Sequence, residues 1–201
     1  MQKISPYPFL LLIAILAIFV FVQNGYAASP KTKNRIKRPL KTVQPIKRVS
    51  APRPLRVTRE SPTAYLTQSG ILQQTNGERQ KHGLKALTLN AHLNAAAAAK
   101  VKDMFEKRYF EHISPSGVGP DKRAEQAGYA FLAIGENLAM GNFENDRSLV
   151  KAWVESPGHR ENILNRSYTE IGIAVLRGVF EGQTTWIAVQ EFGRPLSACT
   201  Q

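Results

Sequence analysis

The sequence predicts an α+β domain in which helices come first and antiparallel strands come last. Helical spacing of apolar residues dominates the domain up to Leu164, whereas apolar and polar residues alternate from Ile171 onward. A further extended stretch is expected near Ala130–Ala139, between the helical segments. Elements grouped in this way are typical of α+β folds, in which helices pack on an antiparallel sheet.

The first 27 residues have the pattern of a secretory signal peptide. Lys3 precedes an apolar run from Phe9 to Val22, and Gly25-Tyr26-Ala27 places small residues on both sides of Tyr26. We predict cleavage after Ala27, because the apolar run is shorter than the roughly 20 residues of a membrane-spanning helix. An uncleaved membrane anchor is the alternative. Both interpretations place the rest of the chain outside the cytoplasm, either secreted or at the cell envelope.

Residues 28–62 are predicted to form a disordered, basic linker. Prolines interrupt any helix, and there is too little apolar surface to offset the entropy of ordering the chain. Eleven Lys and Arg residues and a single acid between Lys31 and Glu60 give this part a charge of +10. Residues 31–59 are therefore a candidate for binding anionic envelope polymers or phospholipid heads. A solvated spacer is the alternative.

The domain itself, residues 63–196, is close to neutral although the whole chain has a net charge of +12. No nucleic-acid-binding face is therefore expected, and we expect a monomer. The single cysteine, Cys199, lies in a short tail at residues 197–201. One cysteine excludes an intramolecular disulfide, which leaves an inert terminal thiol or a bond between molecules.

Four helices are predicted in order along the domain. The first runs from Leu66 to His82-Gly83, where glycine is a stop signal. Asn90 can cap the second, and the alanines Ala95–Ala99 favour helix and allow close packing. The third and fourth helices are predicted at Pro120–Ala127 and Asn145–Val154.

A helix break and two strands complete the domain. Ser156 can cap a new helix with Pro157 as its first residue, because proline fits where the backbone N–H is unpaired. Alternation at Ile171–Val175 and at Trp186–Gln190 then predicts two paired strands, joined by a turn within Gly178–Gly182.

Two of the four histidines are candidates for chemistry. His159 lies in the first turn of the new helix, where the helix dipole disfavours a charged imidazolium. His112 begins a turn-rich segment, and Glu136 lies in an otherwise apolar stretch where a carboxylate needs a partner. Two histidines and a glutamate can hold a divalent metal or relay protons around a bound water. A structural hydrogen-bonded cluster is the alternative. His82 and His92 are expected to face solvent.

These residues belong to a series of motifs that resembles the bacterial CAP-domain proteins (cysteine-rich secretory proteins, antigen five and pathogenesis-related proteins; SCP-like). The resemblance extends from about Leu66 to Gly193. The motifs, in chain order, are Tyr109-Phe110-x-His112-x-Ser114-Pro115-x-Gly117, Ala127-Gly128-Tyr129, Gly135-Glu136-Asn137-Leu138-Ala139, Trp153-x-x-Ser156-Pro157-Gly158-His159-Arg160-x-Asn162-Ile163-Leu164, Ile171-Gly172-Ile173 and Gln190-x-Phe192-Gly193.

The resemblance implies an α-β-α sandwich with a central antiparallel sheet and a cavity lined by His112, Glu136 and His159. Ser156, Pro157 and Gly158 are then expected to shape the turn before His159. Eukaryotic members add a glutamate three positions after the tryptophan. Here that position is Ser156, and Glu155, one residue earlier, is a further candidate for lining the cavity.

Three functions follow as hypotheses. The leading one is a secreted CAP domain that binds zinc or another divalent cation through His112 and His159, with Glu136 orienting a ligand or polarising water. The second is an envelope hydrolase, acting on peptides or peptidoglycan, in which Glu136 is a general base. The third is a non-catalytic module that binds lipid or an envelope polymer.

Overall fold

The central layer is one five-stranded sheet with the strand order β1-β3-β5-β4-β2 in the computed structural model, which describes residues 51–57 and 65–196. Its three long strands are β3 (Phe131–Gly141), β4 (Glu170–Phe180) and β5 (Gln183–Pro195). β5 lies between β3 and β4 and pairs antiparallel with both. The short strands β1 (Leu55–Arg56) and β2 (Thr88–Leu89) form the two edges.

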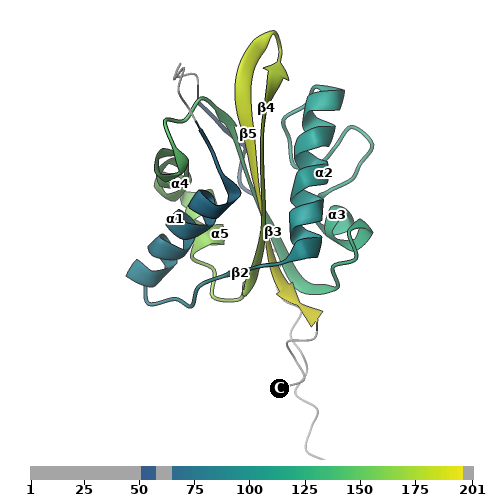
Figure 1. Ribbon diagram of the computed structural model, residues 1–201. Helices are drawn as coiled ribbons and strands as arrows, with labels where there is room; N and C mark the ends of the chain where they lie inside the picture. The colour runs from purple at the N-terminus through teal and green to yellow at the C-terminus, as the bar shows by residue number, and fades with distance from the viewer. Residues whose placement is uncertain (1–50, 58–64, 197–201) are drawn as a thin grey trace, which may run out of the picture. The chain divides into compact units, whose positions relative to one another are not determined.

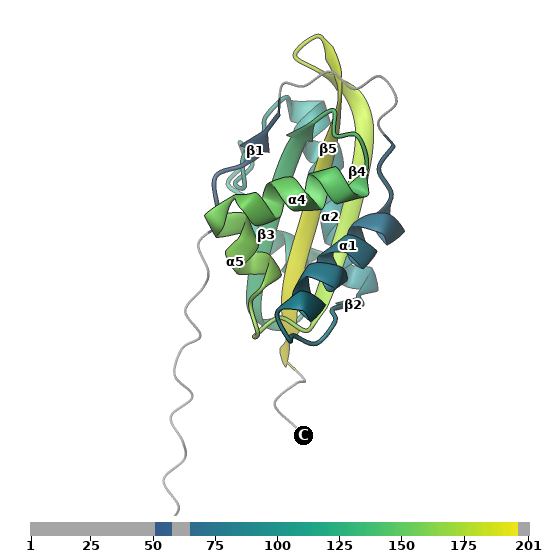
Figure 2. The same ribbon diagram turned by 90° about the vertical axis from the view of Figure 1, so that its left-hand side faces the viewer.

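Helices cover both faces of this sheet and give three layers (Figure 1). One face is covered by α1 (Gln68–Lys81), α4 (Asp146–Glu155) and α5 (Pro157–Ile163), which lie in front of the sheet in Figure 2. The opposite face is covered by α2 (Ala91–Lys107) and α3 (Pro120–Gln126). The predicted α-β-α sandwich is therefore confirmed.

Local sequence signals explain where most helices begin. The Thr67 side chain caps α1 by accepting from the backbone N–H of Gly70, and Asn90 caps α2 by accepting from His92 and Leu93. α3 and α5 each begin with a proline, whose missing N–H costs nothing at that position. Ser156 stands at the N-cap position of α5, but its side chain makes no capping bond. The hydroxyl contacts His159 instead.

The sheet departs from the predicted antiparallel pattern at its edges, because β1 pairs parallel with β3 and β2 pairs parallel with β4. Each edge strand has only two residues and is a short part of a connection that runs alongside a long strand. The composition of residues 51–57 predicted a disordered linker, yet this segment contains β1. We call residues 51–57 the arm.

Apolar side chains fill the space on both sides of the sheet. Trp153 and Ile71 are fully buried between the sheet and α1, α4 and α5, and Val101 and Met104 are buried between the sheet and α2. Because both faces are covered, the middle of β3 is buried throughout, from Ala133 to Gly141. Polar residues in this part of β3 are therefore removed from water on either face.

Several predicted features lie outside the described residues. They are the signal peptide at residues 1–27, the linker before residue 51 and at residues 58–62, and the tail that contains Cys199. None of the helices within residues 65–196 combines the length and the apolar character needed to cross a bilayer.

Candidate functional site

Three elements converge beside the middle of β3. His112 lies in the loop between α2 and α3, Glu136 lies on β3 itself, and His159 lies in the first turn of α5. The loop approaches from one face of the sheet and α5 from the other, since their helices belong to opposite layers. Residues separated by almost 50 positions in the sequence thus meet at one edge of β3.

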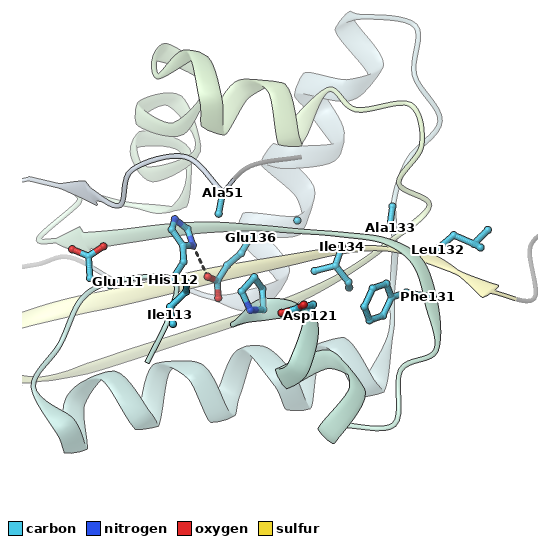
Figure 3. A pocket seen from close by; sticks show the side chains of 12 residues that line it. Ala51, Glu111, His112, Ile113, Asp121, Phe131, Leu132, Ala133, Ile134 and Glu136 are labelled. Carbon is cyan, nitrogen blue, oxygen red and sulfur yellow. Dashed lines mark hydrogen bonds and ion pairs between the residues drawn. The ribbon is translucent and has the colours of Figure 1, made fainter. Parts of the chain in front are cut away.

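His112 and Glu136 form a close pair, in which Nδ1 of the imidazole and Oε1 of the carboxylate are 2.5 Å apart. Figure 3 shows the two side chains pointing toward one another. The Glu136 side chain is fully buried, whereas 12% of the His112 side chain is exposed. The second oxygen of Glu136, Oε2, is buried and has no hydrogen-bond partner among the described residues.

The other nitrogen of His112, Nε2, lies 2.5 Å from the backbone carbonyl oxygen of Pro52 in the arm. A carbonyl can only accept, so Nε2 carries a proton and donates it. Nδ1 faces Oε1 of Glu136, so each ring nitrogen of His112 has a different partner, one from β3 and one from the arm.

His159 is only 1% exposed, and its Nδ1 lies 2.8 Å from the hydroxyl oxygen of Ser156. The pKa of His159 is lowered to about 4, chiefly by burial and in smaller part by the nearby His112, while the backbone of Leu138 acts in the opposite direction. A neutral imidazole was expected from the helix dipole, but burial is the larger cause. Its Nε2 has no partner that meets hydrogen-bond geometry among the described residues.

A buried lysine fixes the loop that carries His112. Lys100 on α2 is fully buried, and its Nζ donates to the backbone carbonyls of Glu111 at 2.6 Å and His112 at 2.8 Å. Burial lowers the pKa of Lys100, and the charge of Glu136 partly opposes this shift. Lys100 occupies the apolar face of α2 at helical spacing from Leu93, Ala97 and Met104. A lysine on an apolar helix face is unusual, and this is the sequence signal that could have identified Lys100.

A second buried carboxyl group lies beside Glu136 on the neighbouring strand. Glu191 on β5 pairs with Glu136 in the register of the two strands, and neither of its carboxyl oxygens has a hydrogen-bond partner of good geometry among the described residues. Burial raises the pKa of Glu191 well above its ordinary value, and the charge of Glu136 raises it further. Glu191 therefore holds its proton while Glu136 pairs with His112.

A chain of buried amides links α5 to the sheet on the opposite face. Asn162 on α5 donates to the backbone oxygen of Glu136 and to the side-chain oxygen of Asn137. Asn137 in turn donates to the backbone oxygen of His159 and to Gln190, which donates to Thr75 on α1. These contacts set the position of His159 relative to Glu136. The sequence motifs include Asn137, Asn162 and Gln190 but do not reveal which residues they contact.

A cavity of about 610 Å³ opens beside the His112–Glu136 pair. Its wall is largely apolar, with Ile113 on one side and Phe131 and Ile134 from β3 on the other (Figure 3). Ala51 of the arm also lines it. The combination of an apolar wall with a few converging polar groups is typical of small-molecule and peptide sites.

Glu155 is not part of this site. It is the last residue of α4, its side chain is 65% exposed, and its carboxylate lies 3.6 Å from Nζ of Lys151. Ser156 lies between α4 and α5, and Pro157 and Gly158 are the first two residues of α5. Pro157 starts α5 and thereby places His159 in its first turn.

Comparison with known proteins identifies the family. The model of the CAP family, the cysteine-rich secretory protein family, matches residues 72–192, which is more than half of the chain. The chain belongs to the CAP family. The described CAP fold thus agrees with the motifs around His112, Glu136 and His159.

Individual relatives cover the domain but not their own full length. The chain is 40% identical over 116 residues to the uncharacterized protein YkwD of Bacillus subtilis, and 36% identical over 107 residues to the uncharacterized membrane protein YlbC of the same organism. These matches cover 58% and 53% of this chain, but only 43% and 31% of the two relatives. The chain therefore spans less than half the length of either curated relative.

Two solved structures share the fold. An extracellular protein with an SCP domain from Bacillus anthracis has a TM-score of 0.52 and 30% identity, with coverage of 63% of this chain and 41% of the other. An outer surface protein from Borrelia burgdorferi has a TM-score of 0.53 and 22% identity, with coverage of 69% and 99%. The second likeness shows the fold alone.

Proposed function

We propose that this CAP domain binds a divalent cation, with zinc as the first candidate, through His112 and His159. The observation that carries the proposal is that Nδ1 of each ring already has a side-chain partner, Glu136 for His112 and Ser156 for His159. Metal-binding histidines commonly use one nitrogen for the metal and the other for such an outer partner. The Nε2 atoms are then the ligand atoms.

The buried groups fit a cation once the arm has moved. Nε2 of His159 has no hydrogen-bond partner among the described residues, and burial keeps this ring neutral and able to bind a metal. Nε2 of His112, by contrast, contacts Pro52. In this conformation no three His, Cys, Asp or Glu side chains of residues 51–57 and 65–196 are arranged to hold a metal ion. A bound cation would supply a Lewis acid and lower the pKa of a bound water.

In this proposal Glu136 is the outer partner of His112, and the two histidines are the protein ligands. The carboxylate fixes the orientation of the ring and raises its basicity, which is the usual effect of such a pair. Two imidazoles leave the remaining coordination positions to water or substrate, as in catalytic sites with an open position.

Calorimetric titration of the mature chain with zinc chloride tests this proposal. We expect saturable binding by the wild type, none by His112→Ala/His159→Ala, and an affinity about 10- to 100-fold lower for Glu136→Gln. His82→Ala/His92→Ala is the matched control, because it removes two histidines whose side chains are exposed. Equal binding by the wild type and His112→Ala/His159→Ala would contradict the proposal.

We place this binding outside the cytoplasm. The support is the signal-peptide pattern of residues 1–27 together with the extracellular SCP-domain relative from Bacillus anthracis. The relative YlbC carries the name of a membrane protein, so retention of the apolar segment as an anchor is the competing outcome. Mass spectrometry of the protein from culture medium and from the membrane fraction distinguishes them, since a secreted chain would begin at Ala28.

An envelope hydrolase is the second candidate, because one oxygen of Glu136 is unpaired among the described residues and the residue lines the cavity. A carboxylate in that position can act as a general base toward water. The test is incubation of the mature chain with peptidoglycan, with and without zinc. Released fragments that disappear with Glu136→Gln would support hydrolysis, and no release under either condition would count against it.

A further inference from the structure

We infer that the edge of β3 beside His112 is a binding groove for an extended, proline-containing peptide, and that the arm occupies this groove in the described conformation. The arm, residues 51–57, has the sequence Ala-Pro-Arg-Pro-Leu-Arg-Val. The ligand class is a peptide with the pattern Pro-x-Pro-Leu-Arg-Val. The inference does not rest on the proposed cation, and each can fail without the other.

Backbone contacts tie the arm to the groove at both of its ends. Leu55 and Arg56 pair parallel with Ala139 and Met140 of β3, and the backbone N–H of Val57 donates to the carbonyl of Met140 at 2.9 Å. At the other end the Pro52 carbonyl accepts from His112. Addition of an extended peptide to an open strand edge is a general mode of peptide recognition, because the backbone supplies the affinity.

Two glycines of the domain make room for the arm. A Cβ atom on Gly158 would lie 2.6 Å from Cβ of Pro52, and a Cβ atom on Gly141 would lie 2.5 Å from the backbone oxygen of Val57. Neither distance is possible without a shift of the arm. The surface of the domain therefore fits the arm closely at two points, Pro52 and Val57, which are five residues apart along the arm.

Side chains of the arm divide between the two layers of the sandwich. Leu55 and Val57 are partly buried and pack against the apolar core around Trp153. The Arg56 guanidinium lies over the rings of Phe110 and Phe180, with its carbon 5.2 and 5.9 Å from their centroids. Arg53 is exposed. Positions 55, 56 and 57 thus carry the side-chain selectivity, and position 53 accepts any residue.

The prolines suit this binding mode. Pro52 and Pro54 have no N–H to leave unpaired, and a proline also keeps the residue before it extended. A segment with two prolines is already close to the bound shape, so less conformational entropy is lost when it binds. The prolines led the composition to predict a linker, and the same prolines favour binding of the arm in the groove.

The arm is held weakly enough to be exchanged for another peptide. All seven of its residues retain solvent exposure, and its strand has only two residues. Segments with little burial and few ladder bonds open at a small fraction of the global unfolding free energy. When the arm leaves, Nε2 of His112 and the wall formed by Ala51 are released together.

The test uses the mature chain with three sets of substitutions. Leu55→Asp/Val57→Asp opens the arm by placing charges against the apolar core while leaving the groove intact. Gly158→Ala blocks the groove through the contact with Pro52. Gly77→Ala is its matched control, because a Cβ atom on this helical glycine of α1 meets no other atom within 4 Å. An acetylated and amidated peptide of residues 51–57 is the probe, and a scrambled peptide is its control.

Peptide binding is followed by NMR chemical shifts of Ala139, Met140 and Gly141. We expect saturable shifts in Leu55→Asp/Val57→Asp, and the same shifts when Gly77→Ala is added to this opened variant. We expect an affinity at least about tenfold lower in the wild type, because the tethered arm competes at an effective concentration of about a millimolar or more. Adding Gly158→Ala to the opened variant should abolish the shifts. The scrambled peptide should produce none.

Three results would overturn the inference. The first is equal peptide affinity in the wild type and the opened variant, and the second is no shift in the opened variant at peptide concentrations of about 10 mM, well above that effective concentration. The third is loss of the folded far-ultraviolet circular dichroism spectrum in Leu55→Asp/Val57→Asp. That last result would make the arm a fixed structural strand of the domain.

Discussion

The buried imidazole of His159 makes a quantitative prediction about stability in acid. Its pKa is lowered from the ordinary 6.5 to about 4 in the folded domain, chiefly by burial. The unfolded chain therefore binds a proton near pH 6.5 that the folded domain takes up only near pH 4. The stabilisation is complete above pH 6.5 and is lost as the pH falls toward 4.

The size of this loss follows from the difference between the two pKa values. One pKa unit corresponds to about 1.4 kcal/mol, so His159 alone removes at most about 3 kcal/mol between pH 6.5 and 4. For a domain whose total stability is about 5–15 kcal/mol this is a large fraction. The relevant assay is urea unfolding of the mature chain at several pH values, with a chelator present to remove bound cations.

His159→Gln tests the assignment, because glutamine has a similar size and does not titrate. We expect the variant to be less stable than the wild type at pH 7 but to lose about 2–3 kcal/mol less between pH 6.5 and 4. His82→Gln is the control, since this histidine is exposed at the end of α1 and should leave the slope unchanged. The same pH slope in the wild type and His159→Gln would refute the reasoning.

Three further predictions concern groups that the sequence alone did not single out or the structure does not describe. Burial raises the pKa of Glu191 above its ordinary value of 4.5, so the stability provided by its protonated form is lost as the pH rises above about 4.5. Glu191→Gln should therefore raise the melting temperature at pH 8 more than at pH 5, and an equal change at both pH values would contradict this. Lys100→Met removes the donor to two backbone carbonyls and should cost about 2–4 kcal/mol in urea unfolding, whereas the exposed Lys102→Met should stay within about 0.5 kcal/mol. Removal of residues 28–50 should reduce cosedimentation with anionic vesicles and cell walls at low salt, and unchanged binding would exclude the electrostatic role of this part of the linker.

The helices and the hairpin were predictable because their signals are local. Asn90 and the run of alanines specify α2, Pro157 specifies the start of α5, and alternation specifies β4 and β5. The turn was placed too broadly, since the strands continue to Phe180 and resume at Gln183. Signals of this kind depend on neighbours within a few positions of the chain, so they can be recognised without knowledge of the fold.

The arm and Glu191 could not be predicted from local pattern. The partner of Leu55 in the sheet is Ala139, more than eighty residues later, and the composition of the arm is that of a linker. Alternation of Trp186, Ala188 and Gln190 predicted the strand β5, and alternation is the pattern of a sheet with one covered side. Here helices cover both faces, so Ile187, Val189 and Glu191 are equally buried.

The geometry at His112 imposes a choice between its two proposed partners. Nδ1 is committed to Glu136, so only Nε2 is available to anything else. Toward the Pro52 carbonyl this atom must carry a proton, and toward a metal ion it must present a lone pair. Both cannot hold at once, so a cation and the arm exclude one another at this atom. By linkage, each weakens the binding of the other by the same factor, which makes the position of the arm part of the binding chemistry of the site.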